Sequence, residues 1–197
     1  MSPDQESDKM GPDANIVLVG FMGTGKSAVG RIMARRMNRT FVDMDARIEN
    51  EVGKPICRIF AEDGEPDFRA RERALVEMLC RERNLVVAGG GGVVLDERNI
   101  VDFDNSGRLI CLQAAEDEIV RRVVRGRHRP LLEGPEDKSD LVRRLLRERK
   151  PFYDRIAYQV DTSGLSPDQV ADRILRLLED EARYASRDET AKLNGKQ

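Results

Sequence analysis

The sequence predicts a three-layer α/β fold, in which helices cover both faces of a five-stranded parallel sheet. Short apolar runs alternate along the chain with stretches of helical periodicity, and a glycine-rich turn joins the first apolar run to the first helical stretch. Parallel strands that are covered on both faces are typically continuous apolar runs. The expected strands are residues 15–20, 40–43, 85–88, 108–112 and 157–161.

Helical stretches are expected between these strands, and the start of the last one is well marked. Ser166 is a favourable N-cap, and Pro167 suits the first helical position because the amide hydrogen that proline lacks would be unpaired there. The apolar residues that follow recur at helical spacing. The expected helices are residues 26–37, 67–83, 115–125 and 139–150, and a last helix that opens at Ser166.

The two ends of the chain differ in composition from its middle. Residues 1–13 are rich in Asp, Pro, Ser and Gly, and we expect a disordered extension there. Residues 182–197 lose the apolar periodicity, and we expect a flexible tail. Residues 14–181 are left as a single domain, which is the domain count that 197 residues favour.

The bulk composition argues against several classes of protein. The net charge is only −2 although 36% of residues are charged, so the chain is not an obvious nucleic-acid binder. No segment approaches the roughly 20 apolar residues of a membrane span, and the polar first residues lack the apolar core of a signal peptide. A single His and three widely spaced Cys disfavour a zinc site or a disulfide framework. We expect a cytoplasmic monomer without a membrane or nucleic-acid partner.

A phosphate-binding loop follows the first expected strand. The segment Gly20-Phe-Met-Gly-Thr-Gly-Lys-Ser27 matches the pattern G-x-x-x-x-G-K-[ST] in full. Its three glycines allow a tight turn whose N–H groups point at phosphate oxygens, and the helix that follows presents its positive end to the same anion. Lys26 would reach the β- and γ-phosphates, and the Ser27 hydroxyl would bind Mg²⁺. The motif predicts a nucleoside triphosphate and leaves the acceptor open.

The acceptor side begins at Asp43-Met44-Asp45, which ends the second expected strand. Ligands of a parallel α/β sheet gather at the carboxyl ends of its strands. Alternate residues of an extended chain point the same way, so both carboxylates are expected to face one site. One would hold Mg²⁺, directly or through water, and the other would orient an acceptor hydroxyl and take its proton. The alternative is that Asp45 only caps the next helix.

Further motifs extend this pattern along most of the chain. They occur in order and at plausible spacings, and together with the phosphate loop the chain resembles the shikimate kinases over roughly residues 14–180. The fourth glycine of the glycine run, Gly92, departs from the family pattern. The motifs are Phe41-Val-Asp-Met-Asp45, Ile59-Phe-Ala-Glu-Asp-Gly-Glu-Pro-Asp-Phe-Arg69 with Glu72, Gly89-Gly-Gly-Gly92, Arg129-Pro-Leu-Leu132 and Arg149-Lys-Pro-Phe-Tyr153.

The resemblance implies a fold and a reaction. The fold would be a P-loop kinase of the nucleoside-monophosphate-kinase type, with a mobile lid at about residues 126–137. The reaction would transfer the γ-phosphate of ATP to the 3-hydroxyl of shikimate, a step of chorismate and aromatic amino-acid biosynthesis, with one Mg²⁺ ion. The small-molecule partners would be ATP and shikimate.

The resemblance also implies a role for each matching residue on the donor side. Lys26 and Arg129 would act on the transferring phosphate, Arg129 from the lid, and Ser27 and Asp43 would lie on the Mg²⁺ side. Either Arg122 or Arg125 would lie near adenine, and the two are not distinguished. The nucleotide contacts would be Gly23, Thr24, Gly25, Lys26, Ser27, Ala28, Arg122, Arg125, Arg129 and Pro167.

On the acceptor side the resemblance assigns Asp45 to the ring hydroxyls and makes it the candidate base. Arg69 and Arg149 would grip the carboxylate, whose planar shape matches the guanidinium fork. Without the family pattern, Arg69 is more simply a solvated helix residue. A flexible turn is the alternative interpretation of the glycine run. The full set is Asp45, Phe60, Phe68, Arg69, Glu72, Gly89, Gly90, Gly91 and Arg149, in which Glu72 would support the site and the two Phe would shape the pocket.

Two other functions share part of this pattern. A kinase for another small hydroxylated acid, such as gluconate, would have the phosphate loop, but it does not explain Phe68-Arg69 together with the Asp pair. A nucleotide-dependent switch or regulatory ATPase would hydrolyse ATP without a small acceptor. Phosphate release with and without shikimate discriminates between these readings.

Overall fold

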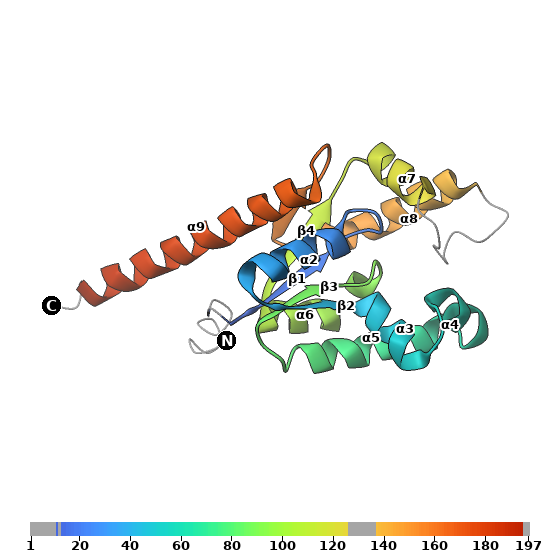
Figure 1. Ribbon diagram of the computed structural model, residues 1–197, viewed down its shortest axis with the longest axis horizontal. Coiled ribbons are helices and arrows are strands. Elements are labelled where there is room, and N and C mark those ends of the chain that lie inside the picture. Colours follow the sequence, from blue (N-terminus) through green and yellow to red (C-terminus); the bar gives the residue numbers. More distant parts are fainter. Residues whose placement is uncertain (1–10, 12, 126–136, 195–197) are drawn as a thin grey trace.

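The protein is a three-layer α/β structure around one parallel sheet (Figure 1). The computed structural model describes residue 11 and residues 13–125 and 137–194. The sheet has five strands in the order β2-β3-β1-β4-β5, and all neighbours pair in parallel. The predicted α/β class and strand number are therefore confirmed. The strands are β1 (Asn15–Val19), β2 (Thr40–Asp43), β3 (Leu85–Ala88), β4 (Gly107–Gln113) and β5 (Tyr158–Asp161).

The helices that were expected from periodicity are present, with ends shifted by a few residues in most cases. Helices α3, α4 and α6 and a 3₁₀ turn were not expected. Helix α4 is only seven residues long, and α3 and α6 are rich in charged residues. The helices are α2 (Lys26–Met37), α3 (Met44–Val52), α4 (Ile56–Glu62), α5 (Glu65–Leu79), α6 (Glu97–Ser106), α7 (Glu116–Arg125), α8 (Lys138–Tyr153) and α9 (Pro167–Asn194), with the 3₁₀ turn η1 (Val93–Leu95).

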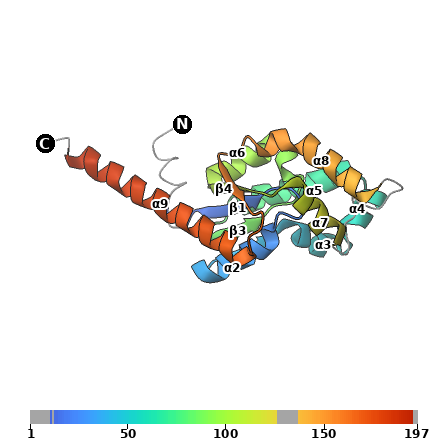
Figure 2. The same ribbon diagram turned by 90° about the horizontal axis from the view of Figure 1, so that it is seen from above.

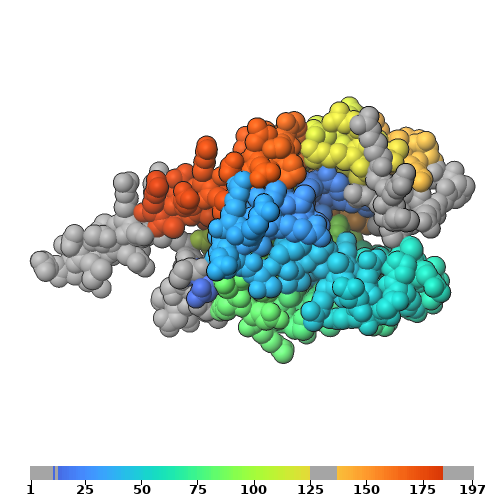
Figure 3. Space-filling model, viewed as in Figure 1, coloured from blue at the N-terminus to red at the C-terminus, as the bar shows by residue number. Residues whose placement is uncertain are grey.

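The two faces of the sheet bury separate apolar cores. Alternate residues of β1 divide between them: Ile16 and Leu18 pack on one face, and Val17 and Val19 on the other. Helices α2 and α9 cover the first face and lie side by side (Figures 1 and 3). The other face is covered mainly by α5, α6 and α8, which Figure 2 shows from above. This double cover explains why the central strands β1 and β3 are buried along their whole length.

The carboxyl ends of the strands lie at the end of the molecule where α3, α4 and α7 are found (Figure 1). Helix α9 extends in the opposite direction. Within the ranges that the structure describes, no helix is both long enough and apolar enough to cross a membrane.

Helix α9 continues into the segment from residue 182 that was expected to be a tail, and the flexibility of that segment stays a prediction. Its backbone is helical to Asn194, so most of the segment expected to be a tail belongs to this helix. The segment contains Ala, Arg, Glu, Lys and Leu and no Gly or Pro before Gly195, and such residues favour a helix by intrinsic propensity. Loss of apolar periodicity was therefore the wrong criterion. The extension expected at residues 1–13 lies almost wholly outside the described residues.

The start of the last helix is as predicted. The Ser166 hydroxyl accepts from the Gln169 amide at 3.3 Å, and the Gln169 side chain accepts from the Ser166 amide at 2.8 Å. This reciprocal pair is a capping box, and Pro167 occupies the first helical position.

Candidate active site

The phosphate loop joins β1 to α2 at the carboxyl edge of the sheet. Its backbone requires glycine, as Gly20 and Gly23 show. Gly20 has φ 139°, and a Cβ atom placed on it would lie 2.3 Å from the Leu112 carbonyl oxygen. Gly23 has φ 85°, and its Cβ would lie 2.8 Å from Val123. Larger residues would be strained at both positions and would push the loop away from β4 and α7.

Lys26, in the first turn of α2, folds back over this loop. Its ammonium group donates to the carbonyls of Gly20 at 2.8 Å and Phe21 at 3.1 Å, and the residue is only 8% exposed. Thr24 is also buried, and its hydroxyl donates to Phe21 at 2.8 Å. A buried cation and the amino end of a helix thus meet at one turn, which is the arrangement that binds phosphate.

The Asp pair after β2 has a different geometry from the one predicted. The strand ends at Asp43, and the chain turns directly into α3, so Asp43 and Asp45 do not alternate along one extended segment. The Asp43 carboxylate accepts from the Ala46 amide at 3.4 Å and caps the helix. The alternative that Asp45 is only a cap is therefore wrong, because Asp43 takes that role. Asp45 lies in the first helical turn.

The electrostatic surroundings of Asp45 suit a proton acceptor. Burial raises the pKa of Asp45 above its ordinary value, and the positive charge of Lys26 opposes this shift. The neighbouring carboxylates of Asp43 and Glu49 add to the rise. A carboxylate with a raised pKa holds a proton more readily than an ordinary aspartate, which is a property expected of a general base.

The glycine run after β3 lies between acidic side chains of two helices. A Cβ atom on Gly90 would lie 2.8 Å from an oxygen of Asp45 and 2.8 Å from an oxygen of Glu72. Asp45 comes from α3 and Glu72 from α5, so the absence of a side chain at Gly90 is what allows both carboxyl groups to converge there. Gly89 extends the pairing of β3 with β1 by one hydrogen bond, because its amide donates to the Leu18 carbonyl at 2.9 Å.

Glu72 is a buried carboxylate that is held by one arginine. It is 2% exposed, and one of its oxygens accepts from Arg69 at 2.7 Å. Its other oxygen has no hydrogen-bond partner among the described residues. Burial raises the pKa of Glu72, and Arg69 opposes the shift. Glu72 is therefore in contact with Arg69, and its supporting role stays a prediction.

Arg69 lies over the glycine run rather than in solvent. It also pairs with Glu65, and its guanidinium carbon lies 5.3 Å from the Phe68 ring centre. A Cβ atom on Gly92 would lie 2.5 Å from two guanidinium nitrogens of Arg69. The fourth glycine, which departs from the family pattern, thus makes room for Arg69. Phe68 is buried and packs on the half-buried Phe60, with ring centres 4.8 Å apart.

Arg149 reaches the same run from α8. It is 7% exposed, donates to the Gly91 carbonyl at 3.1 Å, and its guanidinium carbon lies 6.0 Å from the Phe21 ring centre. Arg69 and Arg149 are 80 positions apart in sequence, yet their guanidinium groups meet at adjacent glycines. The structure therefore brings together the two arginines that the resemblance groups, with Asp45 and Glu72 beside them.

Arg122 connects the phosphate loop to the segment that precedes α9. It donates to the Gly23 carbonyl at 3.3 Å and to the Thr162 carbonyl and hydroxyl at 3.2 Å each. Glu118 pairs with Arg122 and also accepts from the Gly164 amide at 3.1 Å. This network links the phosphate loop to the turn that leads into α9.

Several predicted residues lie outside the part of the chain that the structure describes. The Arg125 side chain, Arg129 and nearly all of the predicted lid lie outside the described residues. Of the two arginines expected near adenine, Arg122 lies against the phosphate loop. Glu118 and Thr162 were not predicted from the sequence. The spacing of four residues between Glu118 and Arg122 was a weak signal for an ion pair. No sequence signal pointed to Thr162.

Ser27 and Asp43 are the residues expected to face Mg²⁺. The Ser27 hydroxyl lies in the first turn of α2, and the Asp43 carboxylate at the end of β2. Among the described residues, no three His, Cys, Asp or Glu side chains cluster as a metal cage. Mg²⁺ commonly takes one or two protein ligands and completes its shell with phosphates and water, so the donor set fits that ion.

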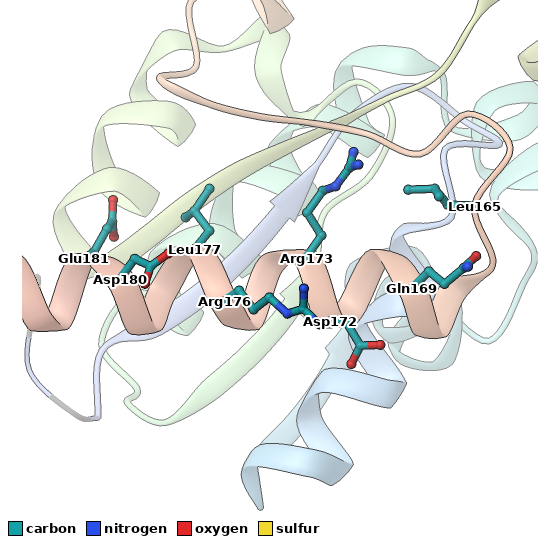
Figure 4. A pocket seen from close by; sticks show the side chains of 8 residues that line it. All are labelled: Leu165, Gln169, Asp172, Arg173, Arg176, Leu177, Asp180 and Glu181. Atoms are coloured by element: carbon teal, nitrogen blue, oxygen red, sulfur yellow. The ribbon is translucent and has the colours of Figure 1, made fainter.

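A groove of about 680 Å³ runs along α9, apart from these residues. Figure 4 shows its lining side chains on the helix and on the turn before it. No candidate residue of the phosphate loop or of the glycine run lines it. The lining residues are Leu165, Gln169, Asp172, Arg173, Arg176, Leu177, Asp180 and Glu181.

Comparison with known proteins decides the family. Residues 22–179 match the family described as Shikimate kinase. The chain belongs to the shikimate kinase family. A shikimate kinase of Pelotomaculum thermopropionicum is 45% identical over 166 residues, which are 84% of this chain and 96% of the relative. One from Thermodesulfovibrio yellowstonii is 40% identical over 164 residues, 82% and 93% of the two chains.

Solved structures of shikimate kinases share the fold. The structure described as shikimate kinase from Acinetobacter baumannii in complex with shikimate is 32% identical, with a TM-score of 0.81 over 90% of this chain and 98% of that one. A gluconokinase from Sinorhizobium meliloti, at 21% identity and a TM-score of 0.60 over 90% and 97% of the two chains, shows the shared fold alone. The predicted resemblance is confirmed, and the chain is a kinase; the role of each residue stays a prediction.

Proposed function

We propose that this shikimate kinase transfers the γ-phosphate of ATP to the 3-hydroxyl of shikimate, giving shikimate 3-phosphate and ADP. The observation that carries the proposal is the meeting of Asp45, Arg69 and Arg149 at the glycine run, beside a complete phosphate loop. A carboxylate base and two guanidinium groups are what a hydroxylated acid requires of an acceptor site. Family membership supports the same reaction.

On the donor side the loop holds the triphosphate. Its N–H groups and the amino end of α2 bind phosphate oxygens, and Lys26 moves from the carbonyls of Gly20 and Phe21 to the β- and γ-phosphates. Arg122 fixes the loop against the turn before α9, near Pro167, where the nucleotide base is expected. Ser27 and Asp43 would hold one Mg²⁺, which would neutralise phosphate charge.

On the acceptor side Asp45 orients the hydroxyl and takes its proton. The hydroxyl oxygen forms a bond to the γ-phosphorus, the bond from that phosphorus to the β,γ-bridging oxygen breaks, and ADP leaves with the electron pair. The raised pKa of Asp45 assists the proton transfer. Because the transition state of phosphoryl transfer is loose, positioning contributes more than base strength.

Recognition of the acid falls to the two arginines. Arg69 and Arg149 present planar guanidinium groups, which bind a carboxylate through paired charge-assisted hydrogen bonds. Glu72 holds Arg69 in place through its ion pair. Phe60 and Phe68 form one wall, and Gly89, Gly90 and Gly91 allow the ring to approach the backbone. Closure of the lid would bring Arg129 to the transferring phosphate. The monomeric state and the cytoplasmic location of the protein stay predictions from the sequence.

A coupled ADP-release assay over a panel of acceptors tests the proposal. The panel contains shikimate, gluconate, a nucleoside monophosphate and a blank without acceptor, each with ATP and Mg²⁺. We expect turnover that depends on shikimate and a blank near background. Turnover of gluconate or the nucleotide but not shikimate would contradict the proposed substrate. ADP release that is the same in the blank would instead favour the regulatory ATPase.

A further inference from the structure

One hydroxyl near the acceptor site has no role in the reaction described so far. Tyr153 lies at the end of α8, four residues after Arg149, so the two side chains project from the same side of the helix. The Tyr153 hydroxyl donates to the Gly91 carbonyl at 2.5 Å, and Arg149 donates to the same oxygen at 3.1 Å. One glycine carbonyl thus accepts from both residues.

This shared carbonyl is fully used. A backbone carbonyl has two lone pairs, and the phenol and the guanidinium take one each. Tyr153 is buried, and burial strongly raises its pKa, so its hydroxyl stays a donor throughout the pH range in which enzymes work. The guanidinium of Arg149 has five N–H donors, and the carbonyl occupies one of them.

The glycine run depends on such contacts because it has no side chains to pack. The Gly91 carbonyl accepts hydrogen bonds from two side chains of α8, those of Tyr153 and Arg149. If the phenol were removed, the carbonyl would have only Arg149 to bind. The guanidinium would then be drawn toward the backbone, away from an incoming carboxylate.

We propose that Tyr153 is a positioning residue that fixes the Gly91 carbonyl and thereby orients Arg149 toward the acceptor carboxylate. The inference rests on the proposed function, since it concerns binding of the acid. Tyr153 need not touch the substrate. Tyr153 acts through Arg149, so its removal should weaken the binding of acidic acceptors more than the binding of neutral ones.

The test is Tyr153→Phe, which keeps the ring and removes only the hydroxyl. We expect KM for shikimate to rise about 3- to 10-fold, the range that one lost hydrogen bond gives, while KM for ATP stays within twofold. The preference for shikimate over its primary-alcohol analogue should narrow by a similar factor, because the alcohol makes little use of Arg149.

The matched control is Tyr158→Phe. Tyr158 begins β5, at the edge of the sheet opposite the site, and its hydroxyl is hydrogen-bonded to Glu181. The same chemical change there should leave the kinetic constants for both substrates unaltered. A second control is the double variant Tyr153→Phe with Arg149→Ala, in which the loss of the hydroxyl should have no further effect on KM for shikimate.

Three results would overturn the inference: an unchanged KM for shikimate in Tyr153→Phe, an equal rise in KM for ATP, or full additivity with Arg149→Ala. Failure of the proposed function is a separate outcome, because wild type would then show no turnover of shikimate. Wild type that is active on shikimate, with a Tyr153→Phe variant of equal KM, contradicts only the role of Tyr153.

Discussion

Gly90 is the position at which one added methyl group should do the most harm to the acceptor site. In Gly90→Ala the new Cβ would lie 2.8 Å from oxygens of both Asp45 and Glu72, whereas ordinary contact begins at 3.4 Å. Each oxygen would have to retreat by about 0.6 Å. Glu72 has little freedom to do so, because it is 2% exposed and bound to Arg69 at 2.7 Å.

The magnitude follows from the cost of overpacking. Forcing an extra methyl group into a packed site costs about 1–3 kcal/mol. If that cost falls on the geometry of Asp45 and Glu72, kcat/KM for shikimate drops roughly 5- to 150-fold. KM for ATP should change little, since the phosphate loop belongs to a different segment of the chain.

Gly92→Ala is the matched control within the same run. Gly92 has φ −116° and ψ 2°, which alanine can adopt. Its Cβ would meet the guanidinium of Arg69, the end of a long side chain that can shift slightly while it keeps its ion pairs with Glu65 and Glu72. A rotamer adjustment costs about 0.5–1 kcal/mol, so we expect a loss of roughly 2- to 5-fold.

Both variants are measured in the coupled assay with shikimate varied at saturating ATP, and then with ATP varied. Thermal unfolding confirms that each variant is folded. The reasoning is refuted if folded Gly90→Ala keeps the wild-type kcat/KM, or if Gly92→Ala loses as much as Gly90→Ala. Either result would mean that the two carboxylates do not need their observed positions.

Three further changes test other parts of the site. Lys26→Ala should lower turnover about 10²- to 10³-fold, the typical loss of one preorganised charge donor, and near-normal turnover of a folded variant would remove Lys26 from the mechanism. Asp45→Asn should lose roughly 10²- to 10⁴-fold in turnover at saturating shikimate; a change of less than threefold leaves Asp45 as a binding residue. Because the folded pKa of Asp45 is raised, its stabilising contribution is present in the protonated form at low pH and is lost as pH rises through that pKa. Asp45→Asn should therefore be at least as stable as wild type at pH 7, with the advantage gone near pH 4 in thermal unfolding, and a lower stability at pH 7 would contradict the burial argument. Arg122→Ala should raise KM for ATP about 3- to 10-fold and leave KM for shikimate unchanged, since its contacts join the phosphate loop to the turn before α9; an equal rise in both constants would contradict that assignment.

The strands and the phosphate loop were predictable because their signals are local. A continuous apolar run indicates a strand covered on both faces, and the loop motif carries its own conformation in its glycines. The start of α9 was also local, since Ser166 and Gln169 form a capping box within four residues. These features depend on neighbours in sequence, not on the rest of the fold.

The geometry predicted for the Asp pair was wrong. Asp is a favoured N-cap, so Asp43 was as good a helix start as Asp45. Reading the segment as extended to residue 45 hid the nine-residue α3, in which Asp45 lies in the first turn. Only the fold shows that this turn faces the glycine run.

Contacts between distant segments could not be predicted from the residues alone. The resemblance grouped Arg69 with Arg149, but nothing local indicated that Tyr153 shares a carbonyl with Arg149, or that Arg122 binds Thr162. That Gly92 makes room for Arg69 could not be predicted either, because Arg69 comes from another segment of the chain. Such contacts arise only when α5, α7 and α8 are packed on the sheet.

The strand order β2-β3-β1-β4-β5 has a consequence for how acceptor specificity can change. In the proposed assignment, elements that follow β2 and β3 would carry most of the acceptor contacts, while elements that follow β1, β4 and β5 would carry the donor contacts. Almost the whole acceptor half is therefore encoded by one uninterrupted stretch, residues 43–92, with Arg149 and Tyr153 as its outlying members. On that assignment, recombination of this stretch between related genes, with compensating changes in α8, would exchange the acceptor and leave the ATP-binding half unchanged.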